Sequence, residues 1–258
     1  MMAAQFAVRR SDARERQSST TEPNVNTLEQ DRQKQSAAEA AAKMVQDRMV
    51  LGLGSGSTAA MYVAALGRRV AQEGLRVIGI PTSESTAAQA RGLRIPLTTF
   101  AEHGVIDLTI DGADEVEPGS LALIKGHGGA LLREKIVAAA SKRMIVVADT
   151  TKIVEHLGSR ETVPVEVVPF GWEQTLGRLG KLGAKVALRL KADGTPYVTD
   201  GGHYIINCGF GAMANPREVA SELDHVVGVV EHGIFIGYAT DVIVGGKNGV
   251  TEMHRTAN

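Results

Sequence analysis

Short apolar runs alternate with helical segments between residues 28 and 150, and a polar or glycine-rich motif follows most of the runs. Runs such as 49–53 are too short for helices and are typical of buried strands. Strands and helices that alternate at this spacing form βαβ units, whose strands are parallel and covered on both faces. The sequence therefore predicts an α/β protein with a Rossmann-like, mainly parallel sheet flanked by helices.

The expected elements of this first part are closely spaced. We expect helices at 28–45, 58–71, 83–91 and 131–141, and strands at 49–53, 75–80, 105–110, 121–124 and 144–148. Ser83 is the expected N-cap of the third helix, because its hydroxyl can accept a hydrogen bond from a free backbone N–H.

A different pattern begins after about residue 157. Here we expect strands at 163–168, 186–190, 197–199 and 204–207, helices at 172–182 and 217–223, and further β-like runs at 226–235 and 241–244. This β-α-β-β-α-β order predicts a small, ferredoxin-like α+β domain with an antiparallel sheet. The expected division is a disordered polar extension at 1–27, a main domain at 28–157 and 230–258, and the small domain at 158–229.

The composition excludes several classes of function. A formal net charge of −1 gives no electrostatic argument for a nucleic acid or an anionic membrane as partner, and no apolar run approaches the ~20 residues of a membrane-spanning helix. Cys208 is the single cysteine, which excludes a disulfide framework and fits a reducing compartment. We therefore expect a cytoplasmic protein, and its seven histidines show no metal-ligand spacing.

Polar motifs stand where four of the expected strands end. They are GSGST at 54–58, PTSEST at 81–86, DGADE at 111–115 and DTTK at 149–152. In open α/β sheets the ligand lies in the crevice beyond the carboxyl ends of the strands. The four motifs therefore predict one shared binding crevice.

The motif at 54–58 places a glycine-rich turn between a strand and a helix, where backbone N–H groups and the helix dipole favour an anion. A dinucleotide site would require G-x-G-x-x-G and an acid after the next strand. Thr58 stands in place of the last glycine, and Ile80-Pro81-Thr82 follows instead of an acid. A methyltransferase-like loop would also require an acid nearby. A cradle for a monophosphate fits this hydroxyl-rich motif best.

Charged residues gather in the segment 111–134, around a glycine-rich turn. Asp111 and Asp114 are three residues apart, Lys125 follows them, and Glu134 falls one turn into an expected helix. A solvated turn or a magnesium site would also account for the aspartates, and Glu134 alone could interact with the helix dipole. Lys125, however, can supply the positive charge that a metal would bring. Together the four side chains predict carboxylates and an ammonium that converge on a small polar ligand.

Two further lysines are candidates for pairing with a phosphate. Lys152 ends the fourth motif, and Lys34 lies on the first expected helix. Either could also be an ordinary surface lysine, and Lys34 is the weaker candidate.

Taken in order, the motifs GLGSGSTA, PTSEST, DGADE, KGHGGALLREK and ADTTK resemble those of ribose-5-phosphate isomerase of the A type, from about Lys34 to the C-terminus. The resemblance implies a substrate held by four loops and a catalytic base at Glu134. His127 departs from the glycine usual at its position and could narrow the pocket or add a donor, and Ser55 replaces a commoner threonine. The implied substrate-binding residues are Ser55, Gly56, Ser57, Thr58, Asp111, Gly112, Ala113, Asp114, Lys125, Gly126, His127, Gly128 and Lys152, with Lys34 as a further candidate.

The implied reaction is the reversible isomerisation of D-ribose 5-phosphate and D-ribulose 5-phosphate, in the pentose phosphate pathway. It moves a proton between C1 and C2 through an enediol or enediolate, and Glu134 could take and return that proton. Lys125, with Asp111 or Asp114, could stabilise charge on the substrate oxygen or help to open the sugar ring. We expect the reaction to need neither a metal ion nor a cofactor, and the protein to be a homodimer or homotetramer.

Three other functions remain open on a scaffold of this kind. An amino-sugar phosphate deaminase would carry a catalytic histidine and release ammonia, and a coenzyme A transferase would use a glutamate nucleophile on thioesters. A sugar-phosphate sensor without activity would usually carry an output domain, and no helix-turn-helix or basic segment is visible. The intact set of acids and bases favours the isomerase.

Overall fold

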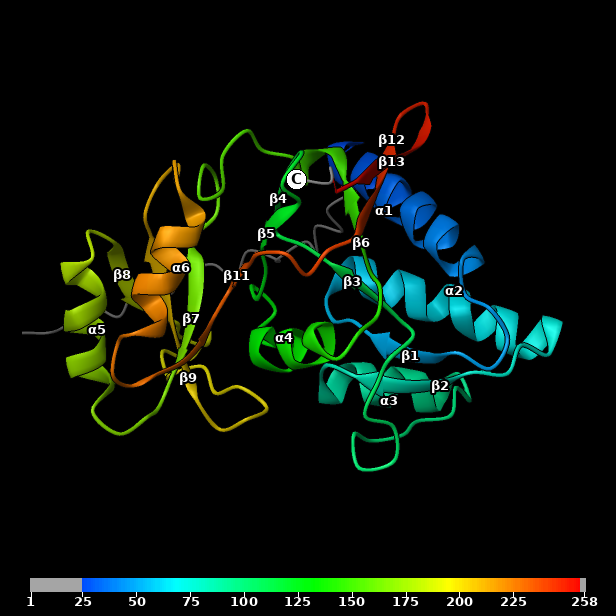
Figure 1. Cartoon of the computed structure of the whole chain (residues 1–258), viewed down its shortest axis with the longest axis horizontal. Coiled ribbons are helices and arrows are strands. Elements are labelled where there is room, and N and C mark those ends of the chain that lie inside the picture. Colours follow the sequence, from blue (N-terminus) through cyan, green and yellow to red (C-terminus); the bar gives the residue numbers. More distant parts are fainter. Residues whose placement is uncertain (1–24, 256–258) are drawn as a thin grey trace, which may run out of the picture.

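A computed structural model describes residues 25–255 of the chain, so that the expected extension at 1–27 lies almost entirely outside the described residues. The molecule has two lobes (Figure 1), the larger built on a six-stranded sheet and the smaller on a four-stranded sheet. A three-stranded sheet lies between them. This arrangement confirms the predicted combination of a mainly parallel sheet with a small antiparallel one.

The six-stranded sheet has the order β13-β12-β6-β3-β1-β2, and all neighbouring strands are parallel except β12 and β13. Its strands are β1 Val50–Leu53, β2 Ile78–Pro81, β3 Leu108–Gly112, β6 Met144–Asp149, β12 Asp241–Gly246 and β13 Gly249–His254. The helices of this lobe are α1 Val25–Lys43, α2 Ser57–Glu73, α3 Glu84–Gly92 and α4 Leu131–Ala139, and a 3-10 turn, η1, spans Thr150–Lys152. Every residue of β6 is buried, as expected for a strand covered on both faces.

The two faces of the large sheet are covered by different elements. On one face, α1 and α2 bring residues such as Ala41 and Leu66 into the same apolar core as Leu51 of β1 and Ile110 of β3. On the other face, Val146 of β6 packs in a second core that includes the three-stranded sheet. The carboxyl ends of β1, β2, β3 and β6 are left at one edge of the sheet, where the four polar motifs begin.

The smaller lobe has the predicted β-α-β-β-α-β order. Its elements are β7 Val163–Val167, α5 Trp172–Lys181, β8 Lys185–Leu188, β9 Tyr204–Gly209, α6 Pro216–Asp224 and β10 Val229–His232. The strand order is β10-β7-β9-β8 and all pairs are antiparallel. Because β10 pairs with β7 as far as His232, the small sheet continues three residues beyond the expected domain limit at 229.

The three-stranded sheet contacts the cores of both lobes. It consists of β4 Glu115–Glu117, β5 Ala122–Ile124 and β11 Ile234–Phe235, and its strands are antiparallel. Side chains of a strand alternate between the two faces of a sheet. Leu123 and Phe235 accordingly pack in the core of the large lobe, whereas their neighbours Ile124 and Ile234 pack in the core of the small lobe.

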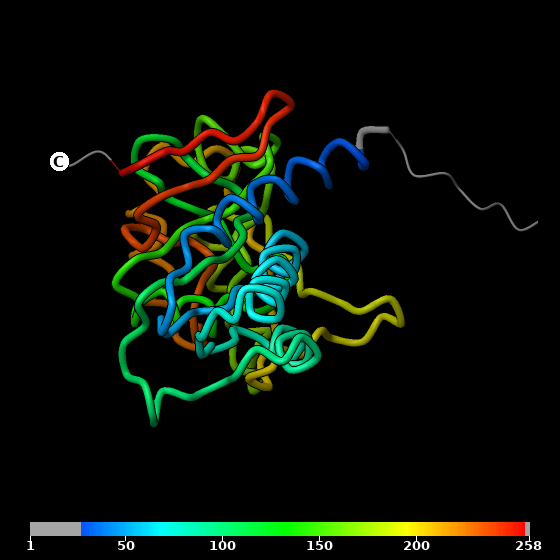
Figure 2. Tube along the Cα trace, turned by 90° about the vertical axis from the view of Figure 1, so that its right-hand side faces the viewer, coloured from blue at the N-terminus to red at the C-terminus, as the bar shows by residue number. Residues whose placement is uncertain are grey.

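The structure corrects one predicted element and adds two. Residues 197–199, expected to form a strand, belong instead to the long connection between β8 and β9, which projects from the body of the molecule as the yellow loop in Figure 2. Pro196 precedes them and lacks the N–H that a ladder needs, so that pairing stops at the isolated bridge between Leu190 and Pro196. β4 and β13 were not predicted, because their residues are mostly charged or polar.

Most other boundaries agree with the predictions to within three residues, including the start of α1 at Val25. Ser83 is the N-cap of α3, and its hydroxyl accepts a hydrogen bond from the backbone N–H of Thr86. None of the helices within residues 25–255 combines the length and the apolar character that crossing a membrane requires.

Gly245 of β12 lies against α1, and a Cβ at this position would overlap the carbonyl oxygen of Gln33. We expect Gly245→Ala to push α1 away from the sheet and to lower the free energy of unfolding by about 1–3 kcal/mol, measured by urea denaturation. Gly246→Ala is the matched control, because a Cβ there meets nothing nearer than 3.5 Å. Its effect should stay within about 0.5 kcal/mol, and equal effects of the two substitutions would contradict the packing argument.

Candidate active site

Three of the four polar motifs at the strand ends line one small cavity of about 130 Å³, whereas no residue of the motif at 81–86 lines it. All of its lining residues were candidates from the sequence, whereas Asp111 and His127 were candidates that do not line it. The lining residues are Lys34, Ser55, Gly56, Ser57, Thr58, Gly112, Ala113, Asp114, Lys125, Gly126, Gly128, Glu134 and Lys152. The candidates from the sequence therefore include every residue of the cavity wall, together with two residues outside that wall.

Lys125 lies between two carboxylates at the inner end of the cavity. Its ammonium nitrogen is 3.0 Å from Asp111 Oδ2 and 3.2 Å from Glu134 Oε2, and it donates a hydrogen bond of 2.6 Å to the carbonyl oxygen of Gly112. The three charged side chains are at most 4% exposed. They come from the ends of β3 and β5 and from the first turn of α4, so the fold must be complete for them to meet.

The environment shifts the pKa of each member of this group. Burial opposes the charge on Lys125, but the carboxylates of Asp111 and Glu134 outweigh it and raise the pKa of the lysine. Burial also raises the pKa of Glu134 to about 8, although Lys125 opposes the shift, and the negative charge of Asp111 adds to it. Burial raises the pKa of Asp111 as well. Glu134 can therefore hold or release a proton near neutral pH.

Asp111 lies behind the wall of the cavity and is fully buried. Its Oδ1 accepts hydrogen bonds from the backbone N–H groups of Ser55 and Gly112, at 3.0 and 2.7 Å. Gly54 allows this approach, because a Cβ at that position would overlap the Asp111 carboxylate. The geometry thus gives Asp111 contact with Lys125 and with the glycine-rich loop.

Asp114 lines the cavity, and its Oδ2 accepts a hydrogen bond of 3.0 Å from the backbone N–H of His127. The imidazole of His127 lies between Asp114 and Glu161: Nδ1 is 3.3 Å from Glu161 Oε2 and 4.0 Å from Asp114 Oδ1, and Nε2 is 3.3 Å from the carbonyl oxygen of Thr162. The His127 side chain is thus outside the wall of the cavity, next to Asp114, which forms part of that wall.

The outer part of the cavity suits an anion. Gly56, with a φ of 93°, is the N-cap of α2, and Ser57 and Thr58 form its first turn. The first N–H groups of a helix have no partner within it and carry partial positive charge. Lys34 of α1 and Lys152 of η1 line the same cavity. Together they offer N–H donors and two ammonium groups to one ligand.

The hydroxyl of Ser55 contacts three other hydroxyl groups. Its Oγ lies 2.7 Å from Thr82 Oγ1, 2.8 Å from Ser83 Oγ and 3.1 Å from Thr86 Oγ1. The motif PTSEST therefore contributes a cluster of hydroxyls that supports the glycine-rich loop from behind. This cluster fixes the loop against the start of α3.

Two residues of the small lobe, which the sequence did not reveal, contact the loop that lines the cavity. Arg189 donates hydrogen bonds to the carbonyl oxygens of Gly126 and His127, and Tyr197 donates one to that of Gly128. No local motif marks Arg189 or Tyr197, because their contacts depend on how the two lobes pack.

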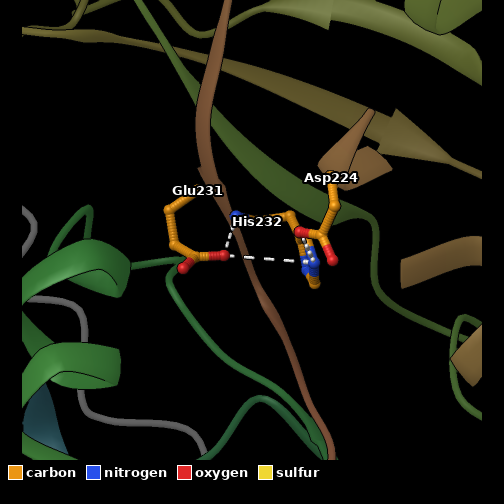
Figure 3. A group of neighbouring side chains, drawn as sticks. All are labelled: Asp224, Glu231 and His232. Carbon is orange, nitrogen blue, oxygen red and sulfur yellow. Dashed lines mark hydrogen bonds and ion pairs between the residues drawn. The ribbon is translucent and has the colours of Figure 1, made fainter. Parts of the chain in front are cut away.

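A second group of ionisable side chains lies outside the cavity, between α6 and β10. Asp224, Glu231 and His232 place one possible metal-ligand atom each within 4.8 Å of the others (Figure 3). The ammonium of Lys135, however, is already 2.6 Å from Glu231 Oε1 and 2.6 Å from the carbonyl oxygen of His232.

Both ring nitrogens of His232 are also engaged. Nδ1 accepts from the backbone N–H of Ile234, and Nε2 lies 3.2 Å from Asp224 Oδ1. Burial and the nearby charge of Lys135 lower the pKa of His232 to about 3, so that the ring is neutral at physiological pH. Lys135 of α4 supplies the positive charge of this group and connects α4 to β10. The group is therefore better explained as a structural contact than as a metal centre.

Known proteins of one enzyme family are similar to this chain over most of its length. A family model described as Ribose 5-phosphate isomerase A (phosphoriboisomerase A) matches residues 78–249. Ribose-5-phosphate isomerase A of Synechococcus sp. (strain JA-3-3Ab) is 56% identical over 226 residues, covering 88% of this chain and 98% of that protein. The protein of the same name from Chloroflexus aurantiacus is 48% identical over 230 residues, covering 89% and 96%.

Solved structures of such enzymes are similar over nearly their whole length. Ribose 5-phosphate isomerase A from Methanocaldococcus jannaschii gives a TM-score of 0.83 at 40% identity, covering 86% of this chain and 98% of that one. A D-ribose-5-phosphate isomerase in complex with phospho-erythronic acid gives 0.84 at 37% identity, covering 90% and 100%.

The burial of Glu134 leads to a direct prediction about its protonation. We expect its carboxyl group to remain protonated at pH 6 and to lose its proton near pH 8, because burial disfavours the charged form. Infrared difference spectra against Glu134→Gln, recorded across this pH range, would follow the carbonyl stretch of the protonated acid. Titration near 4.5, the value of an exposed glutamate, would show that Lys125 outweighs burial.

Proposed function

The chain belongs to the ribose 5-phosphate isomerase A family and is an isomerase of ribose 5-phosphate; we propose that it works through an enediolate and without a metal ion. The observation that carries this proposal is the placement of Lys125 between the buried carboxylates of Asp111 and Glu134, beside the small cavity. A base and a fixed positive charge thus stand next to each other where the reacting carbons would lie.

In this mechanism Glu134 moves the proton. Its carboxylate takes the proton from C2 of the open-chain aldose, which leaves an enediolate with its negative charge on O1. The hydroxyl proton of O2 then passes to O1, and Glu134 returns its proton to C1, which gives the ketose; the reverse reaction follows the same route. A carboxyl with a pKa near 8 is a stronger base than an ordinary glutamate and can exchange protons near neutral pH. Its position in the first turn of α4 directs it into the cavity from one side only.

Negative charge develops on the substrate oxygen as the proton leaves carbon. The ammonium of Lys125 is fixed by its ion pairs and by the Gly112 carbonyl, so it can stabilise that charge without reorganising. Asp114 is the acid in the cavity wall, and we assign to it the contact with a substrate hydroxyl during ring opening. Asp111 holds Lys125 in place from behind the wall.

The phosphate would lie at the outer part of the cavity. The first turn of α2, with Lys34 and Lys152, offers N–H donors and positive charge there. Binding energy from this remote group holds C1 and C2 in register with Glu134. A related isomerase binds phospho-erythronic acid, a phosphorylated sugar acid whose planar, anionic carboxylate resembles an enediolate.

The metal-free part of the proposal rests on the lysine. A divalent ion bridging Asp111 and Glu134 would have to take the place that the Lys125 ammonium occupies, and it would meet a charge of the same sign. The ammonium already supplies the electrostatic stabilisation that a metal would bring.

Family membership also supports further proposals about the protein as a whole. We propose that it acts in the pentose phosphate pathway, assembles as a homodimer or homotetramer, and resides in the cytoplasm. We also propose that the two lobes are separate domains, with limits near residues 157 and 230.

Removing the base should abolish most of the turnover while leaving binding intact. We expect Glu134→Gln to lower kcat for ribose 5-phosphate about 10²- to 10⁴-fold, the range typical of a general base, with substrate still bound in calorimetry. Glu155→Gln, at an exposed position, is the control and should keep its activity. Near-normal turnover by the Glu134→Gln variant would show that Glu134 is not the catalytic base.

Chelation tests the metal-free part separately. We expect purified protein to convert ribose 5-phosphate equally well before and after dialysis against EDTA, because Lys125 supplies the positive charge. Activity that disappears with EDTA and returns with Mg²⁺ or Mn²⁺ would keep the reaction and overturn the metal-free mechanism.

A further inference from the structure

Side chains of the small lobe orient the backbone of the loop at 125–129. Three consecutive carbonyl groups of this loop accept hydrogen bonds from small-lobe side chains. Arg189 Nη1 donates to Gly126 at 3.1 Å and to His127 at 2.9 Å. The hydroxyl of Tyr197 donates to Gly128 at 3.2 Å. All three carbonyls therefore point towards the small lobe.

The opposite sides of the first two of these peptide groups face the cavity, whereas the Gly129 N–H, opposite the Gly128 carbonyl, donates within the loop to the Gly126 carbonyl. The peptide bonds are trans, so each carbonyl and the N–H of the next residue point in opposite directions. The His127 N–H, opposite the Gly126 carbonyl, indeed donates to Asp114 Oδ2 in the cavity wall. By the same geometry the Gly128 N–H, opposite the His127 carbonyl, is directed to the cavity side, and Gly128 lines the cavity.

Arg189 is itself held firmly enough to orient the loop. Its Nη2 donates a hydrogen bond of 2.6 Å to Asn207 Oδ1 of β9, and its backbone N–H pairs with the carbonyl of Ile205. The guanidinium lies 5.8 Å from the centre of the Tyr197 ring, and the Tyr197 backbone N–H donates to the Arg189 carbonyl. A planar guanidinium can fork to several acceptors at once, whereas an ammonium on a flexible stem cannot hold the same geometry.

We propose that Arg189 is a positioning residue for the isomerisation: by fixing the carbonyls of Gly126 and His127, it holds Asp114 in place and aims the Gly128 N–H at the substrate. The proposal deepens the proposed function and rests on it. It assigns the small lobe a part in catalysis, because the side chain that orients the loop directly follows β8 of that lobe. The Gly128 N–H would donate to a substrate oxygen near the reacting carbons, which the phosphate contacts do not reach.

The test compares Arg189→Met and Arg189→Lys with Arg178→Met. Arg178 is an exposed arginine of the same lobe with a single bond to a backbone carbonyl, that of Val227, which makes it a matched control. Two quantities are measured in the full-length protein. They are kcat and KM for ribose 5-phosphate, and hydrogen exchange of the peptide that covers 125–131.

We expect Arg189→Met to lower kcat about 10- to 100-fold, the loss typical of a small misplacement of reacting groups, with little change in KM. KM should hold because the phosphate contacts of Lys34 and Lys152 are untouched. Exchange in the loop should become faster. Arg189→Lys should recover part of kcat and part of the protection, and Arg178→Met should behave as the unsubstituted protein.

Two results would overturn the proposal. One is an unchanged kcat in a folded Arg189→Met protein, whether or not the loop exchanges faster. The other is a loss of kcat without faster exchange in the loop. If Arg189→Met does not fold, the test rests on Arg189→Lys, because one ammonium cannot make all the hydrogen bonds of the guanidinium. Unchanged kcat and unchanged loop exchange in Arg189→Lys would then reject the positioning role of Arg189.

The proposed function fails in a different way. If the unsubstituted protein does not convert ribose 5-phosphate, the reaction is wrong, whereas the exchange measurement still reports whether Arg189 orients the loop.

Discussion

The ion pairs of Lys125 with Asp111 and Glu134 are the interaction on which the site depends. A buried charge without a partner is costly, and here two carboxylates share one ammonium in a region that is almost free of solvent. The group therefore has an excess of negative charge unless one carboxyl keeps a proton. Burial raises the pKa of Glu134 to about 8 and the negative charge of Asp111 adds to the shift, so that this carboxyl can act as a base near neutral pH.

The same lysine stands at the junction of the two lobes. It follows β5, whose side chains alternate between the cores of the large and the small lobe. The ring of Phe235, on the neighbouring strand β11, lies 5.6 Å from the Lys125 ammonium and 4.9 Å from that of Lys135. The ring of Phe235 thus contacts both Lys125 of the cavity and Lys135, which pairs with Glu231 of β10. The packing of the two lobes therefore affects the geometry of the site.

Much of the site could be predicted because it is local in the sequence. Parallel strands bring their carboxyl ends to one edge, so motifs after β1, β3 and β6 had to meet once the strands were recognised. The directions of individual side chains could not be predicted. Ser55 and His127 stand in the expected loops but turn their polar atoms towards Thr82 and Glu161, partners that only the tertiary fold brings near. Arg189 was missed for the same reason, since its acceptors are carbonyl groups that any residue provides.

The order of strands in the large sheet has a consequence for the making of the protein. Asp241 of β12 pairs with Ile145 of β6, and the entire small lobe is encoded between them. While the ribosome is still producing residues 150–240, β6 is an edge strand with apolar side chains and unpaired backbone groups, which is the surface that promotes aggregation of nascent chains. The small lobe has its own core and can fold in that interval. Completion of the large sheet, and with it the protection of β6, has to wait until β12 has been synthesised.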